Sequence, residues 1–222
     1  MGQTHTEEMA MAVQFTQEAA RGPLFLADIS GYTSFLRGVQ EAHKDDAFAT
    51  GQIPEAFRLM SSLLDGIVQS VTPYFTLSKL EGDAVFAFAR SGPDVPHGEE
   101  VLDCIHKCYA SFRTQLADVG VIWTCTCEQC SAATGLDLKF VLHAGDFVIQ
   151  EFAGNPELTG PDVVMAHLLL KSQAAEVLGS HAYALFTESA VDELGVPVDS
   201  AVPMSQSYEH FAPINTFVLG LN

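Results

Sequence analysis

The sequence has few basic residues. Lys and Arg number 10 against 28 Asp and Glu, which gives a formal net charge of −18. A surface this acidic repels the phosphate backbone of nucleic acids, so we expect no DNA or RNA partner. Charged residues make up 17% of the chain and hydrophobic residues 48%, enough to bury a core. The same excess of carboxylates attracts divalent cations.

Long apolar runs and a basic N-terminus are also missing. No apolar segment approaches the roughly 20 residues of a membrane-spanning helix, so we expect no membrane partner. The first 20 residues contain no Lys or Arg, which is unlike a signal peptide. The expected location is the cytoplasm. Because the cytoplasm is a reducing compartment and the number of cysteines, 5, is odd, a disulfide framework is not expected.

No low-complexity linker, internal repeat or break in composition divides the chain. We therefore predict one domain over residues 22–222, preceded by an N-terminal extension over 1–21. Hydrophobic periodicity and turn residues predict its elements. These are, in chain order, a strand at 24–29, helices at 32–40 and 53–71, strands at 74–79 and 84–89, a helix at 101–119, strands at 136–143 and 145–152, a helix at 161–178, and strands at 182–187 and 214–221.

The order of these elements predicts the fold class. Helices alternate with strands, but hairpins also occur, so we expect an α+β fold with a mixed, largely antiparallel sheet and helices packed on one face. The segment 24–29 is a continuous apolar run, which is typical of a central strand buried on both faces. The polar stretch 41–52 is predicted to be a loop.

Two carboxylates stand out against this apolar background. Asp28 interrupts the most apolar strand, where an isolated charge would be costly, so it must lie at the strand's exposed end or meet a cation. Asp83 lies in the turn of the predicted hairpin, four residues after Lys79. If that hairpin neighbours the first strand, both carboxylates converge at one edge of the sheet. They would then form a site for Mg²⁺ or Mn²⁺.

The turn that follows Asp28 is suited to phosphate. The residues Ile29, Gly31, Tyr32 and Thr33 lead directly into a predicted helix. The free backbone N–H groups at such a helix start can hold phosphate oxygens. The alternatives are that Asp28 only caps the following helix, and that Gly82 and Asp83 only form the turn of the hairpin.

Three segments resemble the signatures of one family. The segment 25–33, Phe-Leu-Ala-Asp-Ile-Ser-Gly-Tyr-Thr, resembles the opening signature of class III adenylate and guanylate cyclase domains. The segment 79–87, Lys-Leu-Glu-Gly-Asp-Ala-Val-Phe-Ala, resembles their second signature, and 160–167, Gly-Pro-Asp-Val-Val-Met-Ala-His, resembles the third. The segments occur in the family's order, and the resemblance spans roughly residues 22–190.

This resemblance implies a ferredoxin-like core and a two-metal active site. Asp28 and Asp83 would bind two Mg²⁺ or Mn²⁺ ions, which activate the ribose 3′-hydroxyl and grip the triphosphate of ATP or GTP. Lys79 corresponds to the position that reads the purine, and its partner would fall near Glu157. Members of the family act as dimers with the site at the interface, so a homodimer is implied.

The same resemblance exposes two departures. Val164 stands where the family has an Asn that orients the ribose, and Leu168 stands where it has an Arg that stabilises the transition state. Neither side chain can donate a hydrogen bond or a charge. His167 and Lys171 lie on the same predicted helix and could substitute, although His167 also fits a helix surface or an interface. The resemblance therefore implies that the metal-binding residues of the site are present and that two of its catalytic residues are replaced.

A cysteine cluster forms the second chemical feature. Cys125, Cys127 and Cys130 fall within six residues, in a predicted loop over 123–135. Three close thiols favour a soft cation such as Zn²⁺. The fourth ligand is not local: candidates are His143, Cys104, Cys108, a water or a second subunit. The alternatives are a reduced, exposed loop, a disulfide formed during handling, or a redox-active Cys-X-X-Cys pair. A small group of cyclase-like bacterial proteins resembles this chain in having a Cys-X-Cys-X-X-Cys insertion. Cys104 and Cys108 themselves fit the apolar stripe of a helix and are predicted to be core residues.

Two functions of different classes follow. The first is a divergent nucleotidyl cyclase or related phosphoryl-transfer enzyme that binds metal and nucleoside triphosphate at Asp28 and Asp83. The second is a cyclase-homology domain that binds a nucleotide, a metal or a partner without turnover, and the residues Val164 and Leu168 favour it. A scaffold that works only through its cysteine loop is a third option.

Overall fold

A computed structural model describes residues 17–152 and 155–221 of the chain. The strands are β1 (Gln17–Ser30), β2 (Thr76–Glu81), β3 (Ala84–Phe88), β4 (Asp137–Phe152), β5 (Asn155–Thr159), β6 (Tyr183–Thr187), β7 (Val202–Gln206) and β8 (Ile214–Gly220). The helices are α1 (Tyr32–Ala42), α2 (Glu55–Val71), α3 (Glu99–Ile122), α4 (Glu128–Ser131), α5 (Pro161–Leu169), α6 (Ala174–Leu178) and α7 (Glu188–Leu194), with a π-helical turn η1 (Lys44–Phe48) and a 3-10 turn η2 (Ala132–Gly135).

The eight strands within residues 17–152 and 155–221 join one sheet. Its strand order is β2-β3-β1-β4-β6-β8-β7, and β5 pairs with the C-terminal end of β4. Only β4 and β6 are parallel, and the other pairs are antiparallel. The prediction of an α+β fold with a mixed, largely antiparallel sheet is therefore confirmed.

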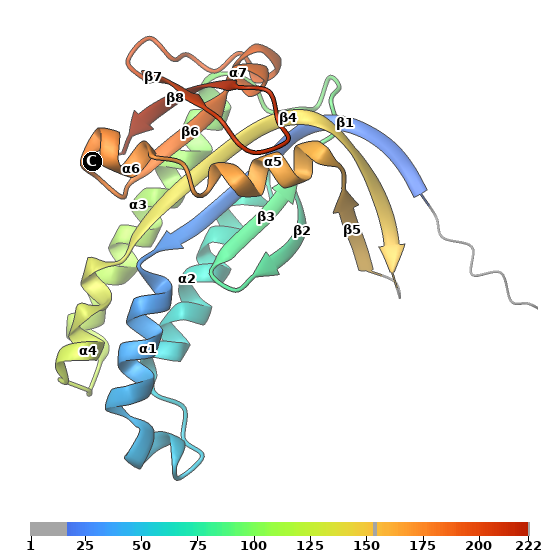
Figure 1. Ribbon diagram of the computed structural model, residues 1–222. Helices are drawn as coiled ribbons and strands as arrows, with labels where there is room; N and C mark the ends of the chain where they lie inside the picture. The colour runs from blue at the N-terminus through green and yellow to red at the C-terminus, as the bar shows by residue number, and fades with distance from the viewer. Residues whose placement is uncertain (1–16, 153–154, 222) are drawn as a thin grey trace, which may run out of the picture.

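The apolar run on β1 explains how the core is divided. Its side chains alternate between two faces, and residues 24–27 are fully buried. Phe25 and Ile29 pack in the cluster formed with α1, α2 and α3, whereas Leu24 and Leu26 pack against α5 and α6. The prediction of a strand buried on both faces is confirmed. The prediction that helices cover only one face is wrong, because α5 and α6 lie on the other (Figure 1).

Several predicted boundaries differ from the structure. The segments 136–143 and 145–152 form one strand, β4, because Gly145 continues the ladder opposite Gly22 instead of breaking it. The helix predicted over 161–178 ends at Leu169 and resumes as α6. The predicted loop 41–52 contains η1, and β5, α4, α7 and β7 are additional elements.

The predicted N-terminal extension 1–21 lies partly outside the described residues, which begin at Gln17. That residue starts β1, so the last part of the predicted extension belongs to the sheet. The boundaries of the single predicted domain stay a prediction. In the part of the chain that is described, no helix combines the length and apolarity needed to cross a bilayer.

The sheet brings three charged residues to one edge. Asp28 lies near the end of β1, opposite Ala84 on β3 and opposite Lys139 on β4. Asp83 directly precedes Ala84, and its carbonyl oxygen accepts a hydrogen bond from the Ile29 N–H at 3.2 Å. The predicted neighbourhood of the hairpin and the first strand is confirmed, and it leaves both carboxylates at the start of α1.

Candidate functional site

A cleft of about 1060 Å³ opens where β1 ends and α1 begins. Asp28 and Asp83 line it together with Ile29, Gly31, Tyr32, Thr33 and His167, all predicted from the sequence as site residues. The helix α5 forms its other wall and contributes Val163, Val164 and Leu168. Five of the seven residues predicted to bind nucleotide therefore share one cleft with both predicted metal ligands.

The start of α1 is built to present backbone N–H groups. Gly31 has φ 88°, a left-handed conformation that favours glycine, and this sharp turn starts the helix directly after β1. No side chain caps the helix start, so its first N–H groups remain free of a side-chain acceptor. The positive end of the helix dipole adds to their attraction for an anion.

The two carboxylates influence one another. Burial raises the pKa of Asp83, and the negative charge of Asp28 raises it further. Burial and the charge of Asp83 also raise the pKa of Tyr32 at the start of α1. A cation placed between the carboxylates would relieve this repulsion.

Lys139 is a site residue that sequence reasoning missed. Its Nζ lies 3.1 Å from Asp28 Oδ1 and donates a hydrogen bond to the carbonyl oxygen of Leu170 at 3.1 Å. The Lys139 side chain is 19% exposed and that of Asp28 17%. The sequence shows only that Lys139 alternates with apolar residues along a strand. The cross-strand register that pairs it with Asp28 is a tertiary feature.

The local charge balance of the cleft is the reverse of that of the chain. Three of the 10 Lys and Arg residues line it, namely Arg37, Lys139 and Lys171, against two acidic residues, Asp28 and Asp83. The cleft therefore carries 3 − 2 = +1, whereas the chain carries −18. His167 and His181 also line it. Such a local reversal favours an anionic ligand.

Lys79 and Glu157 lie outside the lining of this cleft but contact each other. The Lys79 Nζ lies 2.7 Å from Glu157 Oε2 and 3.1 Å from Glu81 Oε1. The hydrogen bond to Glu157 is the main reason that the pKa of Lys79 is raised. The structure thus brings together the residue predicted to read the base and its predicted partner, and their role in reading a base stays a prediction.

His167 joins this charged group to α5. Its Nε2 lies 2.7 Å from Glu81 Oε2, and its ring meets the ring of Phe86 edge-on at 4.9 Å between centroids. The hydrogen bond with Glu81 raises the pKa of His167 and lowers that of Glu81. Glu81 was not predicted as a site residue, although it lies between Lys79 and Asp83 in the second signature.

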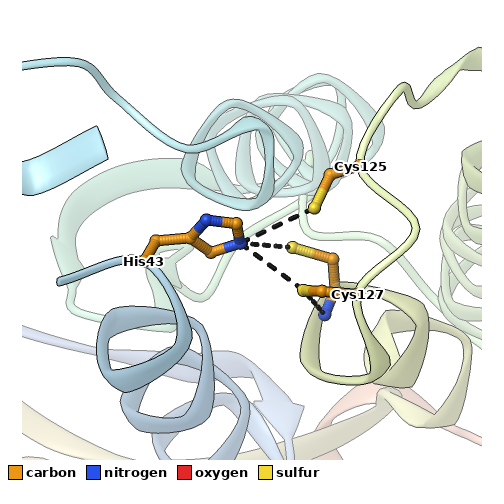
Figure 2. Close-up of side chains that lie close together, drawn as sticks. His43, Cys125 and Cys127 are labelled. Carbon is orange, nitrogen blue, oxygen red and sulfur yellow. Dashed lines mark hydrogen bonds between the residues drawn. The ribbon is translucent and has the colours of Figure 1, made fainter. Parts of the chain in front are cut away.

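The cysteine loop forms a separate cluster. The sulfurs of Cys125, Cys127 and Cys130 lie around the Nε2 atom of His43, which follows the last residue of α1. Figure 2 shows His43 facing Cys125 and Cys127. The four potential ligand atoms all lie within 4.8 Å of one another. His43 was missed because it lies 82 residues before Cys125, in a predicted loop. Spacing along the sequence does not reveal such a contact.

Three residues considered as a fourth ligand lie elsewhere. His143 Nδ1 is 3.0 Å from Thr187 Oγ1, and its Nε2 is 3.2 Å from Asp162 Oδ1, so its ring is engaged inside the sheet. Cys104 and Cys108 are buried core residues, as predicted, and burial raises the pKa of each thiol to about 12. The structure therefore excludes all three from the cysteine loop of the same chain.

Comparison with known proteins gives both a family match and structural relatives. The family described as "Protein of unknown function (DUF2652)" matches residues 60–177. The uncharacterized protein Rv2561/Rv2562 of Mycobacterium tuberculosis is 30% identical over 165 residues, which cover 73% of each chain.

Solved structures resemble the whole fold. A bacterial light-regulated adenylyl cyclase has a TM-score of 0.61 and 14% identity, over 91% of this chain and 52% of that one. The adenylyl cyclase CyaB from P. aeruginosa has a TM-score of 0.54 and 16% identity, over 91% and 95% of the two chains. At these identities the likeness establishes the fold, which is that of cyclase catalytic domains.

Proposed function

The chain belongs to the DUF2652 family and has the fold of cyclase catalytic domains, and we propose that it binds a nucleoside triphosphate together with a divalent cation. The observation that carries the proposal is the cleft in which Asp28 and Asp83 converge beside the start of α1. Carboxylates there provide the oxygen ligands that Mg²⁺ and Mn²⁺ prefer. The resemblance of the first two signatures to those of class III cyclases supports the same assignment.

Each part of the ligand has a matching surface. The free N–H groups at the start of α1, with Arg37 and Lys171, would hold the phosphates, and Asp28 and Asp83 would hold the cation, which would offset the negative charge of the phosphates. Lys139 stays on Asp28 and neutralises part of its charge. The apolar wall of Val163, Val164 and Leu168 covers the ligand from the side of α5. The base is read by Lys79 and Glu157.

The proposed function is binding without efficient cyclisation. Val164 and Leu168 both line the cleft at the positions where the resemblance implies an Asn and a catalytic Arg. An arginine that stabilises the transition state of phosphoryl transfer contributes roughly 10³–10⁵-fold in rate. His167 does not replace it, because its Nε2 is held by Glu81 and its Nδ1 lies 2.7 Å from the carbonyl oxygen of Val163.

The active assembly is proposed to be a homodimer. Val164 beside the cleft and Leu80 on β2 are apolar side chains that are each 51% exposed. Their positions flank Lys79 and His167, so a second copy that covers them would also close the cleft. This arrangement agrees with the interface site that the cyclase resemblance implies.

The basic side chains of the cleft provide the test. Arg37→Ala combined with Lys171→Ala should weaken the binding of ATP or GTP with Mn²⁺ at least about tenfold, because hydrogen bonds to charged groups contribute about 1.5–3 kcal/mol each. Competition against a fluorescent nucleotide measures this change. The control is Arg90→Ala, because Arg90 pairs with Glu18 and does not line the cleft. Equal affinity of the double variant and the control would contradict a phosphate site here.

A further inference from the structure

The cluster at the far end of α1 has the composition and shape of a metal site. We propose that His43, Cys125, Cys127 and Cys130 bind one Zn²⁺ ion in a closed, structural Cys₃His site. The inference is independent of nucleotide binding, because no residue of the cluster lines the cleft at Asp28. Figure 2 shows the imidazole of His43, in the segment that follows α1, pointing at the cysteine loop.

The distances fit tetrahedral zinc. The Nε2 atom of His43 lies 3.6 Å from the sulfur of Cys125, 3.5 Å from that of Cys127 and 3.4 Å from that of Cys130. Zinc bonds of about 2.3 Å to sulfur and 2.0–2.1 Å to nitrogen place these atoms roughly 3.6 Å apart in a tetrahedron. The four atoms all lie within 4.8 Å of one another, so no pair has to approach by more than about 1 Å to reach the roughly 3.8 Å between two sulfurs on a tetrahedral zinc.

Neighbouring groups orient the ligands in the manner of a structural metal site. The other ring nitrogen of His43, Nδ1, lies 3.4 Å from the carboxylate of Asp46 on η1, which leaves Nε2 to face the thiols. The Cys130 N–H donates a hydrogen bond to the sulfur of Cys127 at 3.3 Å. Such N–H donors stabilise a thiolate, the form of cysteine that binds metal.

Glu55 at the start of α2 fixes the entry to the loop. Its Oε2 accepts hydrogen bonds from the N–H groups of Thr124 and Cys125, each at 3.1 Å. Its Oε1 accepts one from the Thr124 hydroxyl at 3.0 Å. The first cysteine is therefore positioned by contacts that do not involve the other ligands.

The chemistry of the ligands favours zinc over the alternatives. Three thiols with one imidazole form a common structural zinc set, whereas Mg²⁺ and Ca²⁺ require oxygen ligands. All five cysteines are free thiols in the structure. A redox pair would use two of the three loop sulfurs and would give no role to His43, which lies within 3.6 Å of all three.

The location indicates what the ion would stabilise. Where α1, α2 and α3 run past the end of the sheet, the short α4 lies beside α1 (Figure 1). The connection from Trp123 to Gly135 has only a four-residue helix and a 3-10 turn of its own. A metal clip between His43 and this connection substitutes for an extended core. It also anchors the end of α1 opposite to the phosphate-binding start.

The test is the metal content of protein purified without an affinity tag under reducing conditions, together with its cobalt-substituted spectrum. We expect close to one zinc per chain and, after replacement by Co²⁺, the d–d bands of a tetrahedral thiolate complex. In chelator competition, His43→Ala should lower zinc affinity by more than the roughly 10–100-fold that changes outside the ligand shell cause. The matched controls are His106→Ala on an exposed part of α3 and Cys104→Ala in the core, which should keep the zinc.

A rescue variant separates ligation from folding. His43→Cys supplies a fourth thiolate at the same position and should retain one zinc, with a cobalt spectrum shifted toward a Cys₄ site. Cys130→Ser should lose the ion. Zinc-free wild-type protein that also gives no tetrahedral cobalt bands would overturn the proposal. So would bound iron in place of zinc, or unchanged zinc affinity in folded His43→Ala.

Discussion

Val164→Asn together with Leu168→Arg is expected to raise the rate of cyclic nucleotide formation from ATP or GTP by about 10³-fold or more. Both positions line the cleft beside Asp28, so the new amide and guanidinium would face the bound triphosphate. The reason is that Asn and Arg would restore hydrogen bonds and positive charge where the present side chains have neither. Mass spectrometry of the products with Mn²⁺ measures the gain over the wild type.

The matched control for this gain is Val177→Asn. Val177 is as exposed as Val164, 51% in each case, but it lies on α6 and does not line the cleft. Substitutions at exposed positions usually change the free energy of unfolding by less than about 0.5 kcal/mol, so neither Val164→Asn nor Val177→Asn should impair folding. A double variant that binds nucleotide normally and still forms no product would show that the cleft does not hold the triphosphate in the geometry of a cyclase.

Lys139→Met is expected to lower the free energy of unfolding by about 3–5 kcal/mol. Lys139 and Asp28 form a largely buried ion pair at 3.1 Å, so the change leaves the carboxylate of Asp28 buried without its cation. Urea denaturation measures the loss. A second substitution, Asp28→Asn, should restore much of it, because the double variant no longer buries an unpaired charge.

Lys107→Met is the corresponding surface control. Lys107 pairs with Asp103, but these side chains are 68% and 56% exposed. Pairs of this kind contribute only about 0–1 kcal/mol. If Lys139→Met were no more destabilising than Lys107→Met, Lys139 would not be needed to compensate the buried charge of Asp28. Lys139 would then not be the group that lets the cleft tolerate two neighbouring carboxylates.

The sequence predicts the metal half of the site because its chemistry lies on local elements. The apolar run before Asp28 predicts a central strand, and Gly82-Asp83 predicts a hairpin turn. Only their adjacency has to be supplied by the fold, and the pairing of β1 with β3 confirms it. The same reasoning fails for Lys139, because its contact with Asp28 depends on the register between β1 and β4.

His43 was missed for a related reason. Three cysteines in six residues predict a metal site by themselves, but the fourth ligand comes from the end of α1 through tertiary packing. His143, the predicted alternative, is held by Thr187 and Asp162 instead. No spacing rule distinguishes these two histidines. Only the packing of α4 against α1 does.

Gly145 allows α5 to approach the sheet closely. The sequence predicts separate strands over 136–143 and 145–152, whereas both segments, Gly145 included, lie inside β4. A Cβ atom there would come within 2.3 Å of the Asp162 carboxylate, whose Oδ2 accepts a hydrogen bond from the Asp146 N–H at 2.7 Å. The glycine is needed for α5 to approach the sheet and form the apolar wall of the cleft.

The proposed function requires that Asp28 and Asp83 bind a cation that holds a nucleoside triphosphate. Calorimetric titration of ATP and GTP, each with and without Mn²⁺, into the wild type and into Asp28→Asn tests it most directly, with Asp199→Asn as an exposed control. We expect Mn²⁺-dependent binding by the wild type and by Asp199→Asn, and loss of that binding in Asp28→Asn. Unchanged affinity in folded Asp28→Asn, or no binding by the wild type, would contradict it.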